Sequence, residues 1–319
     1  MNYEYNVSVV IVCMNNYDQL KACLESIQQY TSSTTYEVIL VAYFFSKENL
    51  MKLKNDFPWV KVIVSNEIRG FSANNNLGLR VAKGEYCFVL NDDTYINQPV
   101  IDQLYKRIKS DNSITCLSPQ ILKPSGEIQY KGMTPISWKN WVKILFKLKE
   151  DNYDPEHKWT NDKGFFQTYN ILGAAFIIKT DIFRNVGFFN EKYFYGPEDR
   201  ALSTLLNQQG YKIYVDSDIK LYHLGGGTAG PRSKTACATR PANRKGWILY
   251  LDEGKTSIHF LLCCFVWLNS AIWSLGWLLK KMLGNKYAMI SFWANINVCR
   301  TIFSKKTTTE IFKQFYRKK

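Results

Sequence analysis

Two adjacent carboxylates stand directly after an apolar run in the first half of the chain. The run YCFVL (86–90) leads into Asn91, Asp92 and Asp93. Neighbouring carboxylates repel each other unless a proton or a cation lies between them. Their hard oxygen atoms suit Mg²⁺ or Mn²⁺, ions that can neutralise a diphosphate. The same composition is also ordinary for a surface turn, so this segment alone leaves both interpretations open.

A second acidic pair comes about a hundred residues later. Pro197, Glu198 and Asp199 precede apolar residues at helical spacing, which predicts a helix that begins at this pair. Carboxylates are favourable at the positive end of a helix, so the pair could serve only to start the helix. A carboxylate in a cleft can also act as a general base that removes a proton from a hydroxyl group.

A histidine follows the next expected strand. His223 stands after the run IKLY (219–222) and before the glycine-rich turn 225–228. An imidazole at a strand end can bind a metal ion, and it can equally pack or cap locally.

These segments need a scaffold that brings them together, and the order of apolar runs predicts one. Strands are expected at 9–13, 36–45, 60–64, 86–90 and 211–215. Helical patterns are expected at 20–27, at 51–57 (a helix or a turn), and from near Ser72 to Gly84. This alternation predicts an α/β fold with a doubly wound, mostly parallel sheet. The loops after Cys13, Phe45, Val64 and Leu90 should then share one cleft.

The chain from Val7 to about Thr228 resembles the family 2 glycosyltransferases with the GT-A fold, in particular the rhamnosyltransferase-like branch. The resemblance is carried, in order, by VSVVIVCMNN, RGFSANNNLGLRVAKGEYCFVLNDDT, LGAAFIIKTDIFRNVGFFNEKYFYGPEDRAL and YHLGGGT. It implies an inverting, metal-dependent transfer of a sugar from a nucleotide donor to a hydroxyl group, with Mg²⁺ or Mn²⁺ as cofactor.

The resemblance also implies roles for individual residues. Asp93 and His223 would bind the metal ion, and Asp199 would be the catalytic base with Glu198 beside it. The implied nucleotide-sugar site consists of Asn15, Tyr43, Gly70, Asn74, Asn91, Asp92, Gly173 and Ala174.

Two positions depart from the family pattern. Ala42 stands where relatives carry an Asp that grips the nucleotide base, and Ala201 stands where many carry another Asp. Base recognition must then come from backbone carbonyls, Asn15 or stacking on Tyr43. The alternative is that donor binding is weakened or lost.

The positive charge of the chain gathers in its C-terminal part. After Gly230 there are sixteen Lys and Arg against three Asp and Glu, out of a net charge of +14. They flank the apolar stretch 256–279, a pattern that an anionic membrane surface attracts and that argues against nucleic acid. We therefore expect a catalytic domain at 1–230 and basic, apolar, membrane-associating helices at 231–319.

Whether this stretch crosses the bilayer is left open by its composition. It is long enough to span as a helix, but His259, Asn269, Ser270 and Ser274 interrupt it. We favour an interfacial or re-entrant helix pair over a single span. A buried helical hairpin packed on the catalytic domain is the third interpretation.

The expected setting is the cytoplasmic face of a membrane, with the chain peripheral or held by one C-terminal helix. The N-terminus has no basic region of the signal-peptide type, and the eight cysteines include no CxxC pair, so we expect no disulfides and no zinc site. The metal motif that starts with Asn91, and the segment GFSANNN, favour dTDP-rhamnose as donor over a UDP-sugar. The expected acceptor is a lipid-linked saccharide, and homo-oligomer formation stays open.

Two other functions compete with sugar transfer as interpretations of the sequence. The Ala42 segment would suit a non-catalytic protein that binds a glycan or nucleotide sugar, or that scaffolds a membrane synthase complex. A nucleotide-binding oxidoreductase is disfavoured because VIVCMNNYD, after the first strand, contains no GxGxxG.

Overall fold

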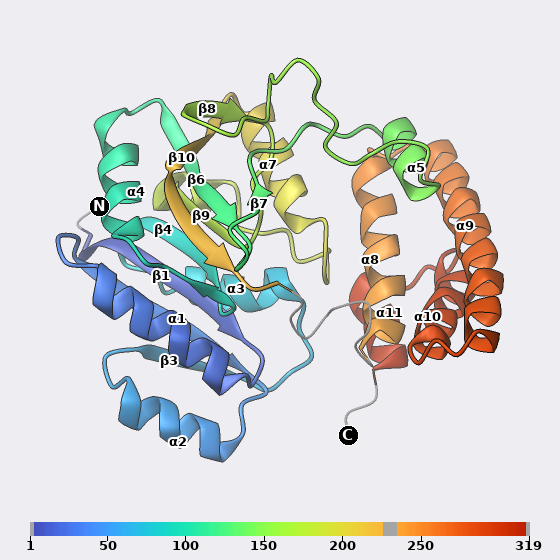
Figure 1. The fold of residues 1–319 in the computed structure, drawn as a ribbon, viewed down its shortest axis with the longest axis horizontal. Coiled ribbons are helices and arrows are strands. Elements are labelled where there is room, and N and C mark those ends of the chain that lie inside the picture. Colours follow the sequence, from blue (N-terminus) through green and yellow to red (C-terminus); the bar gives the residue numbers. More distant parts are fainter. Residues whose placement is uncertain (1–2, 226–234, 317–319) are drawn as a thin grey trace.

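The structure is a computed structural model that describes residues 3–225 and 235–316, and its first two thirds form one mixed sheet with helices on both faces (Figure 1). The strands are β1 (Tyr5–Cys13), β2 (Tyr36–Tyr43), β3 (Lys61–Ser65), β4 (Gly84–Asn91), β5 (Thr94–Tyr95), β6 (Ile114–Leu122), β7 (Ile128–Tyr130), β8 (Phe165–Thr168), β9 (Ala175–Lys179) and β10 (Lys212–His223). The helices are α1 (Tyr17–Tyr30), α2 (Lys47–Asp56), α3 (Phe71–Leu79), α4 (Val100–Ser110), α5 (Trp138–Leu145), α6 (Thr180–Asn185), α7 (Glu198–Gln208), α8 (Ala236–Leu251), α9 (Thr256–Met282), α10 (Ala288–Thr301) and α11 (Thr308–Phe315).

The strand order is β3-β2-β1-β4-β9-β6-β10-β5, with β7 on β6 and β8 on β10. The strands β1 to β4 are parallel, and β9 runs antiparallel between β4 and β6, so β6 and β10 point the same way as β1. The predicted α/β fold with a mostly parallel sheet is confirmed. Its carboxyl ends gather the loops that carry the acidic segments.

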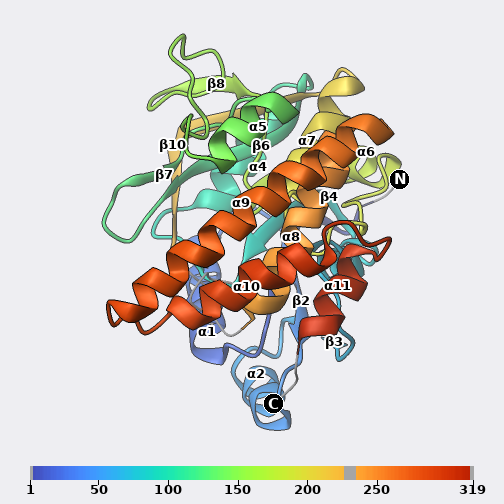
Figure 2. The ribbon, with the colours of Figure 1, turned by 90° about the vertical axis from the view of Figure 1, so that its right-hand side faces the viewer.

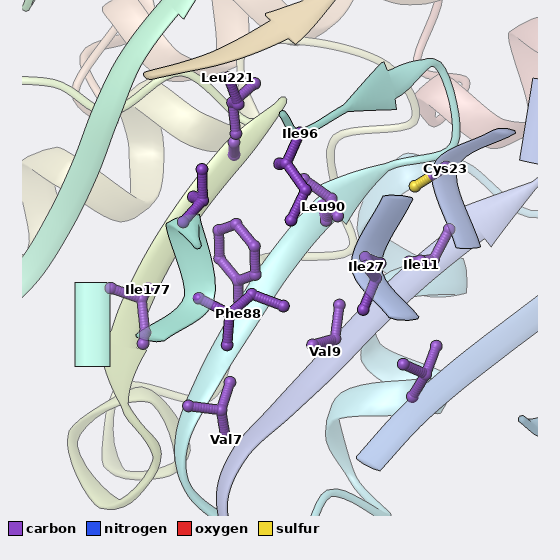
Figure 3. Close-up of a cluster of buried hydrophobic side chains, with 14 of the residues drawn as sticks. Val7, Val9, Ile11, Cys23, Ile27, Phe88, Leu90, Ile96, Ile177 and Leu221 are labelled. Atoms are coloured by element: carbon purple, nitrogen blue, oxygen red, sulfur yellow. The ribbon is translucent and has the colours of Figure 1, made fainter. Parts of the chain in front are cut away.

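Apolar side chains on both faces of the sheet explain the layering. One buried cluster joins the sheet to α1, α2 and α4, and it includes Val9, Ile11, Ile27 and Phe88 (Figure 3). A second cluster joins the opposite face to α3, α6 and α7. Strands buried on both faces have continuous apolar sequences, which is why runs such as VVIVC predicted them.

Three predicted boundaries were wrong, each for a local reason. The helix expected to close at Gly84 ends at Leu79, and Gly84 begins β4 so close to β1 that a Cβ would lie 2.4 Å from the Ser8 nitrogen. The strand expected to reach Phe45 ends at Tyr43 because Phe44 has a left-handed φ of 51°. The runs at 211–215 and 219–223 form one strand, β10, with an irregular register against β6.

The sheet and the helices on its two faces form a three-layer α/β/α sandwich. The helices α8 to α11 pack together beside this sandwich, and α5 packs with them (Figure 1). In Figure 2, α9 passes in front of α8 and runs alongside α10. It forms one unbroken helix, so the helix pair favoured for this stretch was wrong. Asn269, Ser270 and Ser274 are buried within it, and the Asn269 side chain donates a hydrogen bond to the Leu145 carbonyl at 2.9 Å. Within 3–225 and 235–316, α9 alone is long and apolar enough to cross a bilayer.

Candidate active site

A cleft of about 600 Å³ opens at the carboxyl ends of the parallel strands. This volume is typical of sites for small ligands. The predicted site residues that line it are Tyr43, Gly70, Asn74, Asn91, Asp92, Asp93, Gly173, Ala174, Glu198, Asp199 and His223. A larger hollow of about 890 Å³ lies on the far side of α7 and contains none of them. The residues of the two acidic segments and of the histidine segment therefore lie in one cleft.

Asn15 is the one predicted site residue outside the lining of this cleft. Its carboxamide oxygen accepts a hydrogen bond from the Ser46 backbone nitrogen at 2.8 Å, and the Asn49 side chain donates to the same oxygen at 3.0 Å. Asn15 therefore holds the start of α2. The glycine-rich turn after Gly225 lies outside the described residues.

Asp93 and His223 come together through a short antiparallel pairing. The register of β5 and β10 places Thr94 opposite His223. As a result the His223 Nε2 lies 3.0 Å from the Asp93 carboxylate, and both side chains are almost fully buried. The Leu224 backbone nitrogen also donates to the Asp93 carbonyl at 2.8 Å, which fixes the turn around the pair.

The other ring nitrogen of His223 contacts Gln129, which lies on β7. His223 Nδ1 is 3.1 Å from the Gln129 carboxamide oxygen, an atom that can only accept. In the neutral ring the proton therefore lies on Nδ1, and the lone pair of Nε2 faces the Asp93 carboxylate. A proton or a metal ion between Nε2 and the carboxylate, which are 3.0 Å apart, would stabilise this arrangement.

This pair fits Mg²⁺ or Mn²⁺ through one carboxylate and one imidazole. Within 3–225 and 235–316 no group of three or more His, Cys, Asp or Glu could hold a metal ion. Cations that act on phosphates are commonly held by one or two protein side chains, with water and the phosphate oxygens completing the shell. Asp93 and His223 would then hold the metal only together with a phosphate-bearing ligand.

Asp92 lies on the other side of the same turn. Burial and, to a lesser extent, the neighbouring Asp93 carboxylate raise the pKa of the Asp92 carboxyl to about 6. The Cys13 thiol at the end of β1 contacts Asp92 and offsets part of this rise. The turn thus carries two carboxylates whose repulsion favours the binding of a cation.

The pair Glu198 and Asp199 begins α7, as predicted. The Asp199 carboxylate accepts hydrogen bonds from the backbone nitrogens of Gly173 at 3.2 Å and Arg200 at 2.7 Å. Burial raises the pKa of Asp199 above its ordinary value, although the adjacent Arg200 lowers it. Burial and the neighbouring Asp199 raise the pKa of Glu198 to about 8. Two adjacent buried carboxyl groups disfavour double ionisation, so the pair retains a proton more readily than two isolated carboxyl groups would.

Small residues let backbone segments close the cleft. A Cβ on Gly70 would lie 2.0 Å from the Phe194 carbonyl oxygen, so only glycine fits there. The Ala174 carbonyl accepts from the Asn91 backbone nitrogen at 2.9 Å, which links the turn at Gly173 to the metal motif. Asn74 is buried and fixes the loop before α3: its side chain donates to the Arg69 carbonyl and accepts from the Ser65 hydroxyl.

Residues 8–185 match the family described as Glycosyl transferase family 2, which is more than half of the chain. The chain belongs to this family. It is 30% identical over 137 residues to the cholesterol galactosyltransferase of Borreliella burgdorferi, which is 42% of this chain and 38% of that protein. It is 21% identical over 223 residues to the O-antigen biosynthesis protein RfbC of Myxococcus xanthus, which is 68% of this chain and 17% of that protein. The chain thus spans less than two fifths of either relative.

A solved structure extends the likeness of this family 2 member to nearly the whole chain. It is the mannosyltransferase PcManGT from Pyrobaculum calidifontis, in complex with GDP-Man and Mn²⁺. The match has a TM-score of 0.53 at 12% identity, and it covers 96% of this chain and 89% of that one. At this identity the match shows the fold alone, and it confirms the GT-A type of architecture.

Several residues that line the cleft of this family 2 member were not predicted from the sequence. Gln129 sits on a three-residue strand with no alternating pattern, so no periodicity pointed to it. Phe312 and Tyr316 line the cleft from the C-terminal end of the chain, and only the folded structure brings them there. Arg69 also lines the cleft, and the motif GFSANNN immediately after it could have pointed to it.

Proposed function

We propose that this chain transfers a sugar from a nucleotide donor to an acceptor hydroxyl group, with inversion at the anomeric carbon. The observation that carries the proposal is the meeting, in one cleft, of the Asp93–His223 pair with the carboxylate of Asp199. The first two can hold a metal-bound diphosphate, and the third can accept a proton. Together they supply the two functions that direct displacement at a sugar carbon requires.

Asp199 is the proposed base. The backbone nitrogens of Gly173 and Arg200 orient its carboxylate, and its raised pKa strengthens it as a proton acceptor. As the acceptor oxygen bonds to the anomeric carbon, its proton passes to Asp199 and the nucleotide diphosphate departs from the opposite side. This single displacement inverts the configuration and forms no bond between sugar and protein.

Asp93 and His223 would hold Mg²⁺ or Mn²⁺. The ion, when bound, supplies positive charge for the departing diphosphate. Gln129 keeps the His223 ring in the orientation and tautomer that direct Nε2 at the site. Asn91 and Asp92 lie beside this pair and would contact the diphosphate and its ion, while Gly173 and Ala174 let the donor sugar approach the backbone.

The proposed donor is dTDP-rhamnose, with a UDP-sugar as the alternative. The order of residues in the metal motif and the likeness to an O-antigen biosynthesis protein support a donor of cell-surface polysaccharide synthesis. The proposed acceptor is a lipid-linked saccharide at the cytoplasmic face of the membrane. Residues 1–230 would carry the chemistry and 231–319 the membrane contact.

The outward face of α9 supports this membrane contact. Leu275, Leu279 and Met282 are 66%, 63% and 84% exposed, while Asn269 and Ser274 are buried against the protein. A helix that hides its polar side and presents its apolar side is suited to lie in a membrane surface. Spanning the bilayer would instead remove α9 from its contacts with α5 and α10.

The test of the reaction is calorimetric titration with dTDP and with UDP, each with and without Mn²⁺, followed by a sugar-transfer assay with the nucleotide sugar that matches the better ligand. Metal-dependent nucleotide binding, together with product of inverted configuration, is the expected result. A folded chain that binds neither nucleotide would contradict the proposal.

A second candidate is a non-catalytic nucleotide-sugar or glycan-binding protein. Ala42 favours it, because this residue is fully buried in the apolar core and offers the base no carboxylate. Under this alternative a nucleotide binds, but no sugar is transferred to any acceptor in a membrane extract from the source cells.

A further inference from the structure

The C-terminal helix α11 borders the same cleft as the acidic residues, although it follows three helices that lie outside the sandwich. Phe312 and Tyr316 line the cleft together with Tyr43 of β2. The Phe312 ring stacks between two others: its centroid is 4.0 Å from that of Phe194 and 4.9 Å from that of Tyr316. Aromatic side chains from widely separated elements thus form one border of the cleft.

The position of α11 is fixed by contacts with the rest of the fold. Its first turn has a capping box between Thr307 and Glu310. The Thr308 hydroxyl donates to the Lys192 carbonyl at 2.6 Å, two residues before Phe194. Ile311 and Phe312 pack in a buried cluster with α8. The Tyr316 ring is therefore held at the cleft by a folded helix.

The acidic residues that line the cleft are already assigned to the diphosphate and to proton transfer. Within 3–225 and 235–316 these residues are Asp92, Asp93, Glu198 and Asp199. At the position near the end of β2 where the resemblance implies an Asp for the base, this chain has Ala42, which is buried in the core. Any recognition of the base must therefore use other groups near the end of β2.

The geometry of the sheet indicates where the base would lie. The metal pair is beyond β4, and β1 separates β4 from β2. Since neighbouring strands are about 4.8 Å apart, Tyr43 at the end of β2 lies roughly 10 Å from the metal motif across the sheet. That is about the distance from a diphosphate to the base of the same nucleotide. Tyr43 is held there because its hydroxyl accepts from the Arg69 backbone nitrogen at 3.3 Å.

We propose that Tyr316 and Tyr43 form an aromatic binding site for the nucleotide base, so that α11 completes the donor site. The inference rests on the proposed function, since it assigns the base end of the same donor. Stacking uses the π-face that every base possesses, so such a site holds a base without selecting strongly among bases. The substitution of the usual carboxylate by Ala42 is then compatible with donor binding.

The test compares variants of α11 by calorimetry in the presence of Mg²⁺, with UDP, dTDP and inorganic pyrophosphate as ligands. Tyr316→Ala should weaken the binding of both nucleotides about tenfold and leave pyrophosphate binding unchanged. Tyr316→Phe keeps the ring and should bind as the wild type does. Lys313→Ala, an exposed position on the same helix, is the matched control and should change nothing.

The possible results distinguish failure of the base site from failure of the proposed function. Unchanged nucleotide affinity in Tyr316→Ala would overturn the base site alone, and so would an equal loss of pyrophosphate affinity, which would indicate a general disturbance of the cleft. A strong preference of the wild type for one of the two nucleotides would also count against recognition by stacking. If the wild type binds pyrophosphate but neither nucleotide, the proposed function fails together with this inference.

Discussion

The helices α4 and α9 differ in the side chains that they expose. α4 buries Val100, Leu104 and Ile108 and exposes Lys106 and Lys109, as expected for a helix that faces water. α9 also buries apolar residues, but it buries asparagine and serine beside them and exposes leucine, tryptophan and methionine. The difference supports the proposal that the outer face of α9 contacts an apolar environment, while the outer face of α4 contacts water.

The chemistry is divided in the same way. The proposed catalytic and metal-binding side chains all belong to the first 225 residues, whereas the excess positive charge lies after residue 230. Substitutions in the sandwich should therefore change turnover without changing membrane binding, and substitutions on α9 should do the reverse. α11 is the exception, because it belongs to the C-terminal helices and borders the cleft.

The largest expected effect comes from Asp199→Asn. The amide keeps the shape of the side chain but cannot accept the proton, so kcat should fall by about 10³-fold or more. Nucleotide affinity and binding to lipid vesicles should stay as in the wild type. Asp218→Asn, the same exchange at an exposed site on β10, is the control. Turnover within tenfold of the wild type would show that Asp199 is not the base.

A second substitution tests the exposed apolar face of α9. Leu275→Glu places a charge on the exposed face of α9 and should weaken binding to vesicles of phosphatidylcholine with phosphatidylglycerol by at least about tenfold. Turnover of a water-soluble acceptor should stay unchanged. The matched control is Met51→Glu on α2, which replaces a side chain of similar exposure, 61% against 66%.

Other results would assign the α9 face differently. Equal vesicle binding by both variants would remove the membrane as the partner of this face. If the wild type is instead a dimer that Leu275→Glu converts to a monomer, the face is covered by a second copy of the chain.

The sequence predicted the sandwich and most of the cleft because both depend on local signals. Continuous apolar runs marked β1, β2 and β4; one acidic motif stood at the end of β4, and the other stood at the start of the helical pattern that forms α7. The environment of α9 could not be predicted, because Asn269 and Ser274 appear as interruptions until the helices that cover them are known. Nor could the aromatic border from α11, because long-range packing on Phe194 creates it.

A smaller effect is expected from Gln129→Ala, which tests whether Gln129 orients the His223 ring beside Asp93. The variant keeps Asp93 and His223 but removes the acceptor that orients the ring. Affinity for Mn²⁺ in the presence of the nucleotide should fall about tenfold, as is typical for partners of metal-binding histidines. Titration of activity against Mn²⁺ checks this: the activity at saturating metal should largely recover. Loss of activity at every metal concentration would assign Gln129 a direct role with the substrate.

The last prediction concerns stability and leaves activity aside, through Glu198→Gln. Because burial raises the pKa of Glu198 from 4.5 to about 8, the folded chain prefers the protonated form. The stability this preference confers is complete below about pH 4.5 and is lost as the pH rises towards 8. Glutamine stays neutral and can still accept from the Gly196 nitrogen. The free energy of unfolding of the variant, relative to the wild type, should therefore increase between pH 5 and pH 8, by on the order of 3 kcal/mol. Parallel denaturation curves at the two pH values check this, and a constant difference would mean that Glu198 is not buried as a neutral acid.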